Sequence, residues 1–169
     1  QTLDLSANQQ LESDDYKEFF SHCHNLQDVD LSSTLAEDDA YIELIKNNRN
    51  TLKNLNMQSN SAGLTPGTIL KAIAEHCGKQ FESIQLFDSQ EAVNDEGIIA
   101  LVKSCPKLKN LNVMFADISE SALDAIAEHG ESLRLLNISE LPKVPSVKTI
   151  EKILKGCPKL IRLSISEDV

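Results

Sequence analysis

Tryptophan is absent from this chain of 169 residues, and glycine occurs only six times. So few glycines disfavour the loops that cradle phosphate groups, because those loops need close backbone approach and left-handed residues. The chain has no apolar run of 18 residues, so no segment is predicted to span a membrane. No charged stretch followed by an apolar core and a cleavage site opens the chain, so no secretory signal is recognised.

The short motifs of several enzyme classes are missing as well. There is no GxSxG, HExxH or CxxC motif, which would indicate a serine nucleophile, a zinc site or a redox pair. Cys23 is the one cysteine with a histidine on each side, His22 and His24, and adjacent residues at a helix end diverge, which disfavours a catalytic pair. His76 and His129 fall near predicted helix C-termini, where the helix dipole favours a cation. We therefore predict no catalytic residue, no metal site and no cofactor.

Positive charge is in short supply. The chain has 16 Lys and Arg against 26 Asp and Glu, a formal net charge of -10. A field of this sign repels phosphate backbones and anionic lipid headgroups, so neither nucleic acid nor a membrane surface is expected as a partner. The acidity itself has two interpretations, simple solubility or an acidic recognition face, of which solubility is the commoner.

The four cysteines share one place in a recurring pattern. Cys23, Cys105 and Cys157 each lie three residues before the first leucine of a repeated phrase. Cys77 lies four residues before Phe81, which takes that leucine's place. One fixed position for a small residue predicts buried packing groups, whereas a disulfide framework would link different positions. We therefore expect free thiols and a reducing, cytoplasmic location.

What the chain has in abundance is repetition. The phrase Leu-x-x-Leu-x-Leu, or a close apolar variant, returns about every 26 residues. Its copies begin at Leu26, Leu52, Phe81, Leu108, Leu133 and Leu160. A partial copy, Leu3-Asp4-Leu5-Ser6, opens the chain in the register of Val29 and Leu31. A repeat of this length cannot bury its apolar face alone, so the period predicts a stacked solenoid.

Each repeat has the pattern of a helix followed by a short strand. In the copy from 93 to 114, Asn94 is a favoured N-cap residue, and the apolar residues that follow have helical spacing. Pro106 then ends the helix, because proline disfavours helical geometry in the residue before it. Leu111 and Val113 are spaced by two, as in a strand with one buried face.

The order of these elements determines the predicted fold. Strands that repeat in one direction must be parallel, with right-handed crossovers through the helices. We predict an α/β horseshoe solenoid of about six repeats plus an opening strand, with the parallel sheet on the concave face and the helices on the convex face. Thr65-Pro66 predicts one of the helix starts, a cap residue followed by proline at the first helical position.

Some of these residues resemble a known family. Cys105 to Val113 reads Cys-Pro-Lys-Leu-Lys-Asn-Leu-Asn-Val, Cys157 to Leu160 repeats its beginning, and Val93 to Gly97 reads Val-Asn-Asp-Glu-Gly. They resemble the cysteine-containing leucine-rich repeats, an F-box-associated and ribonuclease-inhibitor-like subfamily, over nearly the whole chain. The resemblance implies the horseshoe fold. It also implies protein binding, since such repeats often form the substrate-reading half of F-box proteins in ubiquitin ligases, and occur in bacterial effectors and assembly factors.

One position departs from that subfamily. A cysteine or asparagine usually lies eight residues after the first leucine of the phrase. In this chain only Asn60, and Asn8 by extrapolation to the opening copy, fit; the other copies have Thr34, Ser89, Ala116, Leu141 and Asp168. We therefore expect the hydrogen-bond ladder of the inner loops to be mostly absent.

The third, fifth and seventh residues of each phrase are predicted to point outward onto the concave face. The middle of this face carries an aromatic residue, a methionine and a leucine beside polar amides, as protein hot spots do. Its charges run from acidic near the N-terminus to basic near the C-terminus. The predicted protein-binding residues are Asp28, Asp30, Gln85, Phe87, Asn112, Met114, Leu135, Asn137 and Arg162.

Each of these features has an alternative interpretation. The apolar residues Phe87, Met114 and Leu135 can instead pack under a loop or a neighbouring domain. The charge gradient can arise by chance among a few residues. The column of asparagines that includes Asn112 and Asn137 is either a recognition row or a ladder that satisfies its own hydrogen bonds.

These observations predict one leucine-rich repeat domain over 1–169, a noncatalytic domain that recognises a protein through its concave face. It would be the substrate-recognition part of a ubiquitin-ligase adaptor or of a bacterial effector. The alternative is a scaffold or assembly factor that acts through its ends or its convex face. Because neither end shows a polar cap, we expect a flanking domain or a second copy to cover an end, by self-association in the latter case. A chain that begins at Gln1 is also expected to be a fragment or a processed product.

Overall fold

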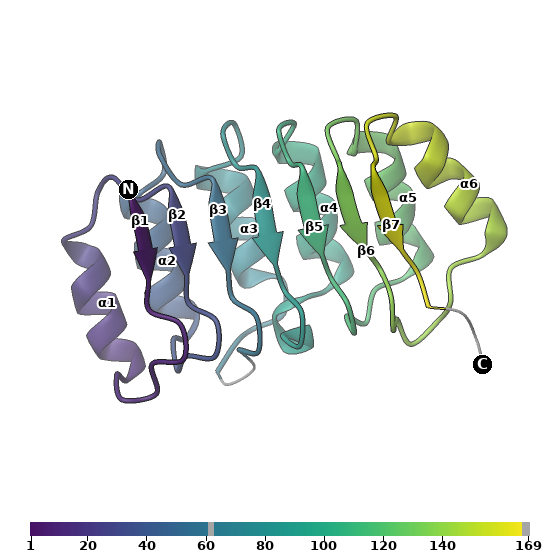
Figure 1. The fold of residues 1–169 in the computed structure, drawn as a ribbon. Helices are drawn as coiled ribbons and strands as arrows, with labels where there is room; N and C mark the ends of the chain where they lie inside the picture. The colour runs from purple at the N-terminus through teal and green to yellow at the C-terminus, as the bar shows by residue number, and fades with distance from the viewer. Residues whose placement is uncertain (61–62, 167–169) are drawn as a thin grey trace.

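The computed structural model describes residues 1–60 and 63–166, where strands alternate with helices (Figure 1). Each strand is three residues long. The strands are β1 (Thr2–Asp4), β2 (Asp28–Asp30), β3 (Asn54–Asn56), β4 (Ser83–Gln85), β5 (Asn110–Asn112), β6 (Leu135–Asn137) and β7 (Arg162–Ser164).

The helices are about ten residues long and connect each strand to the next. They are α1 (Ser13–Ser21), α2 (Asp38–Asn47), α3 (Thr68–His76), α4 (Asp95–Ser104), α5 (Glu120–His129) and α6 (Val147–Gly156), with a 3-10 helix η1 (Gln90–Ala92) before α4. Among the residues that the structure describes, no helix has the length and hydropathy needed to cross a membrane.

The strands form one parallel sheet in sequence order from β1 to β7. The register follows the repeat, since Leu3 pairs with Val29, and Val29 pairs with Leu55. The predicted opening strand is therefore confirmed. Parallel strands need a crossover that returns the chain to the same edge of the sheet, and the helix of each repeat provides it.

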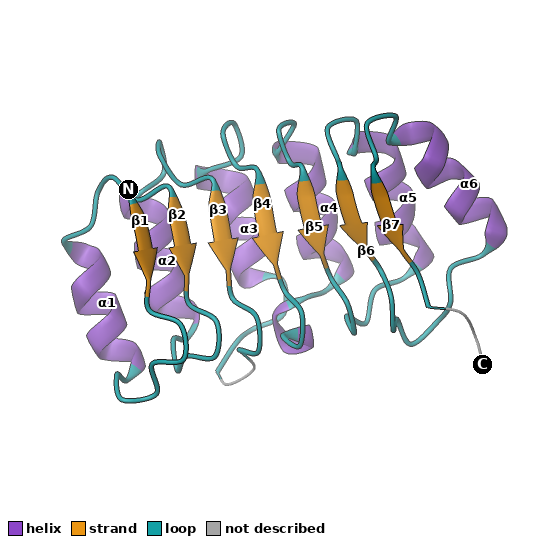
Figure 2. Cartoon of the chain, viewed as in Figure 1, coloured by secondary structure: helices purple, strands orange, loops and turns teal. Residues whose placement is uncertain are grey.

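The helices cover one face of the sheet and leave the other face open (Figure 2). The first, fourth and sixth residues of each phrase point toward the helices. In the copy that begins at Leu52 these are Leu52, Leu55 and Met57, which are at most 1% exposed. Burial of each such side chain stabilises the fold by about 1.5–3 kcal/mol. The predicted fold class, an α/β leucine-rich-repeat solenoid with a parallel concave sheet and convex helices, is confirmed.

A left-handed residue follows the strands at the same place in successive repeats. In the described ranges, the residues other than glycine with positive φ are Ala7, Ser33, Ser59, Asp88, Phe115 and Glu140, at 55° to 68°. Each is the third residue after its strand. Left-handed geometry costs a non-glycine residue about 1–2 kcal/mol. The cost is offset in part because the N–H of this residue bonds to the next repeat, as from Ser33 to the Gln58 carbonyl at 2.8 Å.

The residue after each left-handed position forms a buried ladder in the first half of the solenoid. Asn60 accepts a hydrogen bond from the backbone N–H of Thr34 at 2.8 Å and donates one to the Tyr41 hydroxyl at 2.5 Å. Ser89 accepts from the backbone N–H of Asn60 at 2.9 Å and donates to the Met57 carbonyl at 2.6 Å. Thr34, Asn60 and Ser89 are at most 6% exposed.

The expectation that this ladder is mostly absent is therefore wrong for these repeats. A hydroxyl group can both donate and accept, so threonine and serine replace the asparagine of the subfamily. Ala116 and Leu141 occupy the same place in later repeats with apolar side chains, as expected. Asp168 lies outside the residues that the structure describes.

A second set of hydrogen bonds connects the helix starts. Asp95, in the first turn of α4, accepts from the backbone N–H of Ser119 at 2.8 Å. Glu120, in the first turn of α5, accepts from the backbone N–H of Ser146 at 2.9 Å and from the Thr149 hydroxyl. The hydrogen bond from Thr149, followed by those from Ser146, lowers the pKa of Glu120. Ionised carboxylates therefore connect neighbouring repeats here.

The two predicted helix starts have different outcomes. Asn94 caps α4 as predicted, since its side chain accepts a backbone hydrogen bond from the first turn at 2.8 Å. The start at Thr65-Pro66 is wrong, because α3 begins at Thr68 behind a left-handed Gly67 with φ 78°. The Pro66 carbonyl accepts from Asn94 at 3.1 Å, and a Cβ on Gly67 would collide with the same side chain. The turn at Pro66 and Gly67 therefore packs against the neighbouring repeat and is not part of α3.

The cysteines occupy the predicted packing position. Cys77, Cys105 and Cys157 are buried, Cys23 is half-buried, and all four are free thiols in this structure. Burial raises the pKa of Cys77 to about 12 and that of Cys157 to about 11. For Cys105, burial and then the neighbouring Cys77 raise the pKa to about 12. Buried thiols with such pKa values carry little thiolate at neutral pH.

Candidate functional site

The open, concave face of the sheet carries the predicted binding residues. In the strands from β2 to β5 the middle residue is buried and its two neighbours are half-buried, so the predicted alternation is confirmed. Leu135 and Arg162 are exposed, and the remaining predicted residues are half-buried: Asp28, Asp30, Gln85, Phe87, Asn112, Met114 and Asn137. Phe87 and Met114 lie in the turns after β4 and β5, and the others lie in the strands.

The N-terminal end of this face is acidic. Asp28 and Asp30 on β2 each accept a hydrogen bond from an asparagine on β3, Asp28 from Asn54 and Asp30 from Asn56, the latter at 2.9 Å. Asp4 on β1 pairs with Asp30 on β2. Hydrogen bonds from the hydroxyl and the backbone N–H of Ser6 lower the pKa of Asp4. These carboxylates line a hollow of about 290 Å³ over β1 to β4.

The amides of the middle strands serve the protein's own turns in part. The side-chain oxygens of Asn56, Asn112 and Asn137 each accept from the backbone N–H two residues later, at 3.1 to 3.3 Å. Asn112 also donates its amide to the Gln85 side chain at 3.1 Å. The Asn137 amide has no partner among the residues that the structure describes. The asparagine column therefore satisfies part of its own hydrogen bonding, and its role as a recognition row stays a prediction.

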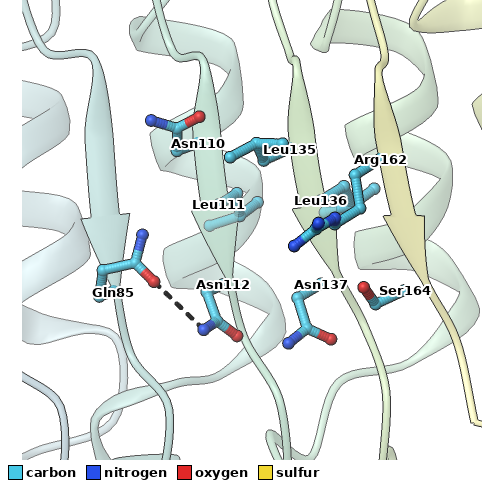
Figure 3. A pocket seen from close by; sticks show the side chains of 9 residues that line it. All are labelled: Gln85, Asn110, Leu111, Asn112, Leu135, Leu136, Asn137, Arg162 and Ser164. Atoms are coloured by element: carbon cyan, nitrogen blue, oxygen red, sulfur yellow. Dashed lines mark hydrogen bonds between the residues drawn. The ribbon is translucent and has the colours of Figure 1, made fainter.

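The C-terminal end of the face is basic and apolar. Leu135, the first residue of β6, is 41% exposed. The Arg162 side chain extends from β7 toward β6, between Leu135 and Asn137 (Figure 3). It makes no ion pair with a carboxylate of residues 1–60 or 63–166. Together with Asn112, these side chains line a hollow of about 180 Å³.

The acidic and basic hollows lie next to each other on the open face of the sheet, and Gln85 lines both of them. We call the open face that carries these two hollows, from β1 to β7, the trough. The floor of the trough is made of buried residues such as Leu55 and Leu111, and its walls are the polar side chains of the strands. The predicted charge gradient runs along this trough, from Asp28 and Asp30 at one end to Arg162 at the other.

The structure does not bring the three predicted apolar residues together. Leu135 is the third residue of its phrase and lies within the trough, whereas Phe87 and Met114 are seventh residues and lie in the turns after their strands. Four residues of extended chain separate these positions along a strand by about 13 Å. The apolar residues of the candidate site therefore form two groups, Leu135 within the trough and Phe87 with Met114 at its edge.

Phe115 belongs to the group at the edge of the trough, and the sequence analysis did not predict it. It is the left-handed residue after β5, with φ 68°, and it is 40% exposed. Its ring lies 5.8 Å from that of Phe87, centroid to centroid. The corresponding residues of other repeats are small or polar. The available signal was an aromatic residue directly after the seventh position of the phrase.

The described residues offer little for chemistry. Among them, no three His, Cys, Asp or Glu side chains are placed to hold a metal ion together. The largest pKa shifts belong to buried packing groups, such as Tyr41, whose pKa is raised well above its usual range by burial. The Tyr41 hydroxyl is occupied by the Asn60 ladder. The arrangement can bind polar and charged groups at its open face.

No protein-family profile matches this chain, whereas comparisons with known sequences and with known structures find similar proteins. Over 73 residues, or 43% of the chain, it is 36% identical to the F-box protein FBX14 of Arabidopsis thaliana. The match covers 11% of that protein, so the chain spans only a small part of that relative's length.

The structural likeness is to the tropomodulin C-terminal domain of Caenorhabditis elegans. The TM-score is 0.61 at 16% sequence identity, over 79% of this chain and 85% of that one. At this identity the likeness concerns the fold alone, and it agrees with the leucine-rich-repeat solenoid described above.

Proposed function

We propose that this chain is a noncatalytic protein-interaction domain, a single leucine-rich repeat domain that binds a segment of a protein partner in its concave trough. The observation that carries the proposal is the open face of the trough, in which Leu135 and Arg162 are exposed. Neither side chain contributes to the core or to a ladder. Arginine is enriched in protein-recognition surfaces, and here an exposed apolar side chain, Leu135, lies beside it.

The finer role rests on the comparison with the F-box protein. A shared stretch of repeats supports a role in reading substrates for a ubiquitin ligase, and presentation in a bacterial effector is the other setting considered for such repeats. We propose a reducing, cytoplasmic compartment, because the four thiols are free. The acidic charge favours a protein partner over nucleic acid or an anionic membrane.

The test is affinity capture from a cell lysate with matched variants. The variant L135Q/R162Q removes the leucine and the charge from the trough and leaves the buried residues unchanged. Arg134→Gln is the control, since Arg134 is exposed and one residue outside β6 but does not line the trough. The proposal expects specific partners to be captured by the wild type and the control and lost from the double variant. Equal capture by all three would contradict it.

Exposed apolar side chains on the last repeat support a second candidate, a scaffold that acts through this end. Val147 and Leu154 on α6 are 77% and 56% exposed, and Ile161 before β7 is 76% exposed. Such a cluster is typical of a contact surface. Sedimentation of the wild type and of Leu154→Lys tests this role. Association that weakens in the variant supports the scaffold, and a monomer at all concentrations contradicts self-association.

A further inference from the structure

The trough has opposite charges at its two ends, and this polarity specifies the chemistry of what it binds. We infer that its ligand is an extended peptide segment with a carboxylate near one end and a basic side chain about seven residues away. The inference rests on the proposed function and adds the chemical class and length of the partner segment.

The carboxylate site is at β6 and β7. The Arg162 guanidinium lines the hollow that Leu135, Asn112 and Asn137 also line. A guanidinium binds a carboxylate through two parallel hydrogen bonds. Leu135 lies beside it in the paired strand and can contact an apolar neighbour of the bound acid. A free C-terminal carboxylate and an aspartate or glutamate side chain present the same group, so the source is decided by experiment.

The basic site is at β1 and β2. Asp28 and Asp30 are paired with asparagine amides, which leaves both carboxylates with their negative charge unneutralised. Asp4 adds a third carboxylate at the same end. The lysines that do form ion pairs in the described residues pair with Asp39, Glu96, Glu82 and Asp124, none of which lies on this end of the trough. A lysine or arginine of the ligand would meet these acids.

The distance between the sites gives the length of the segment. Neighbouring strands lie about 4.8 Å apart, so β2 and β7 are separated by about 24 Å. An extended chain advances about 3.4 Å per residue, so about seven residues cover this distance. Between the ends, Gln85 lines both hollows and can pair with main-chain groups of the ligand.

The experiment is selection from a displayed library of random decapeptides, some with a free C-terminus and some with a blocked one. The wild-type domain is expected to enrich peptides with an acidic group and a Lys or Arg about six to eight positions apart. Enrichment that requires the free C-terminus would identify the terminal carboxylate as the acid. Peptides without charge separation, or no enrichment, would overturn the inference.

Charge reversal then tests the pairing directly by fluorescence anisotropy. Arg162→Glu is expected to weaken a selected peptide about tenfold, and replacing the peptide's acidic residue by lysine should restore most of the affinity to this variant. Arg134→Glu, the matched control outside the trough, should change the affinity less than about twofold. Loss without rescue overturns the inference.

The proposed function can survive the failure of this inference, and the two failures differ in appearance. Selected peptides that bind without charge preference but are lost in L135Q/R162Q show recognition in the trough by another ligand chemistry. Peptides that bind equally to this double variant place the binding elsewhere and overturn both.

Discussion

Replacing Asn60 by alanine is the sharpest test of what holds the first repeats together. Asn60 is 2% exposed, and its side chain accepts from the Thr34 backbone N–H and donates to the Leu31 carbonyl and the Tyr41 hydroxyl. The Leu31 carbonyl keeps a second partner, the Thr34 hydroxyl at 2.8 Å. The substitution therefore removes the acceptor of the Thr34 N–H and one of the two side-chain partners of the Tyr41 hydroxyl, the other being Thr34.

The expected cost follows from these two groups. A buried polar group that loses its partner costs about 1–3 kcal/mol, so Asn60→Ala should lower the free energy of unfolding by about 3 kcal/mol. This is a large part of the total of about 5–15 kcal/mol for a folded domain. At a slope of about 2 kcal/mol per molar urea, the unfolding midpoint should fall by about 1.5 M.

The assay is urea unfolding followed by circular dichroism. Asn54→Ala is the control, because Asn54 is an asparagine on the open face whose bond to Asp28 is reached by solvent, and its loss should cost less than about 1 kcal/mol. If Asn60→Ala costs no more than this control, the ladder does not stabilise the repeats as described.

Three further outcomes are expected. Acid should destabilise the protein through Glu120, because the pKa of this carboxyl is lower in the folded state than in the unfolded state. Its contribution to stability is complete above the unfolded pKa and is lost as the pH falls through the folded pKa. In a pH series of urea unfolding midpoints, Glu120→Gln should therefore reduce the fall at acid pH, and an unchanged fall would contradict this. Phe115→Gly should leave the free energy of unfolding unchanged or raise it by up to about 1 kcal/mol, because glycine adopts the left-handed geometry freely and the lost ring is exposed. A clear fall in Tm would mean that the contact between Phe115 and Phe87 stabilises the protein by more than the left-handed geometry costs. In the native state at pH 8, a thiol reagent should modify Cys23 first and Cys77 only on unfolding, since Cys77 is buried with a pKa of about 12; equal rates in a peptide-resolved time course would show that the core opens readily.

The sequence predicts the fold well because the repeat length sets the register in which neighbouring strands pair. Strands 26 residues apart pair residue for residue, as Leu3 with Val29, so the spacing along the chain becomes the alignment in space. Alternation along each strand likewise predicts which residues face outward. Both features depend on local periodicity, which a single sequence contains.

Features that depend on contacts between repeats were harder to predict. Thr34 and Ser89 join the Asn60 ladder because the neighbouring repeat offers a partner within reach, which the residue types alone do not show. Similarly, α3 begins at Thr68, later than predicted, and the turn before it packs against Asn94 of the next repeat, which the sequence of the turn does not show.

The candidate site was predicted in part. The rows of outward residues follow from alternation, and so does the charge gradient from Asp28 to Arg162. The grouping of Leu135 with Phe87 did not hold, because the third and seventh positions of the phrase lie at different ends of a strand. Phe115 was missed because its exposure comes from the left-handed turn, which the phrase does not encode.

Site-specific photo-crosslinking tests the central claim most directly. A photoreactive amino acid replaces Leu135, in the trough, or Leu154, on α6, two exposed leucines on different surfaces. If the concave trough binds the partner, illumination in cells should yield a specific crosslinked protein from position 135 and none from position 154. A crosslink that forms only at position 154 would contradict the account and place the interaction on the last helix.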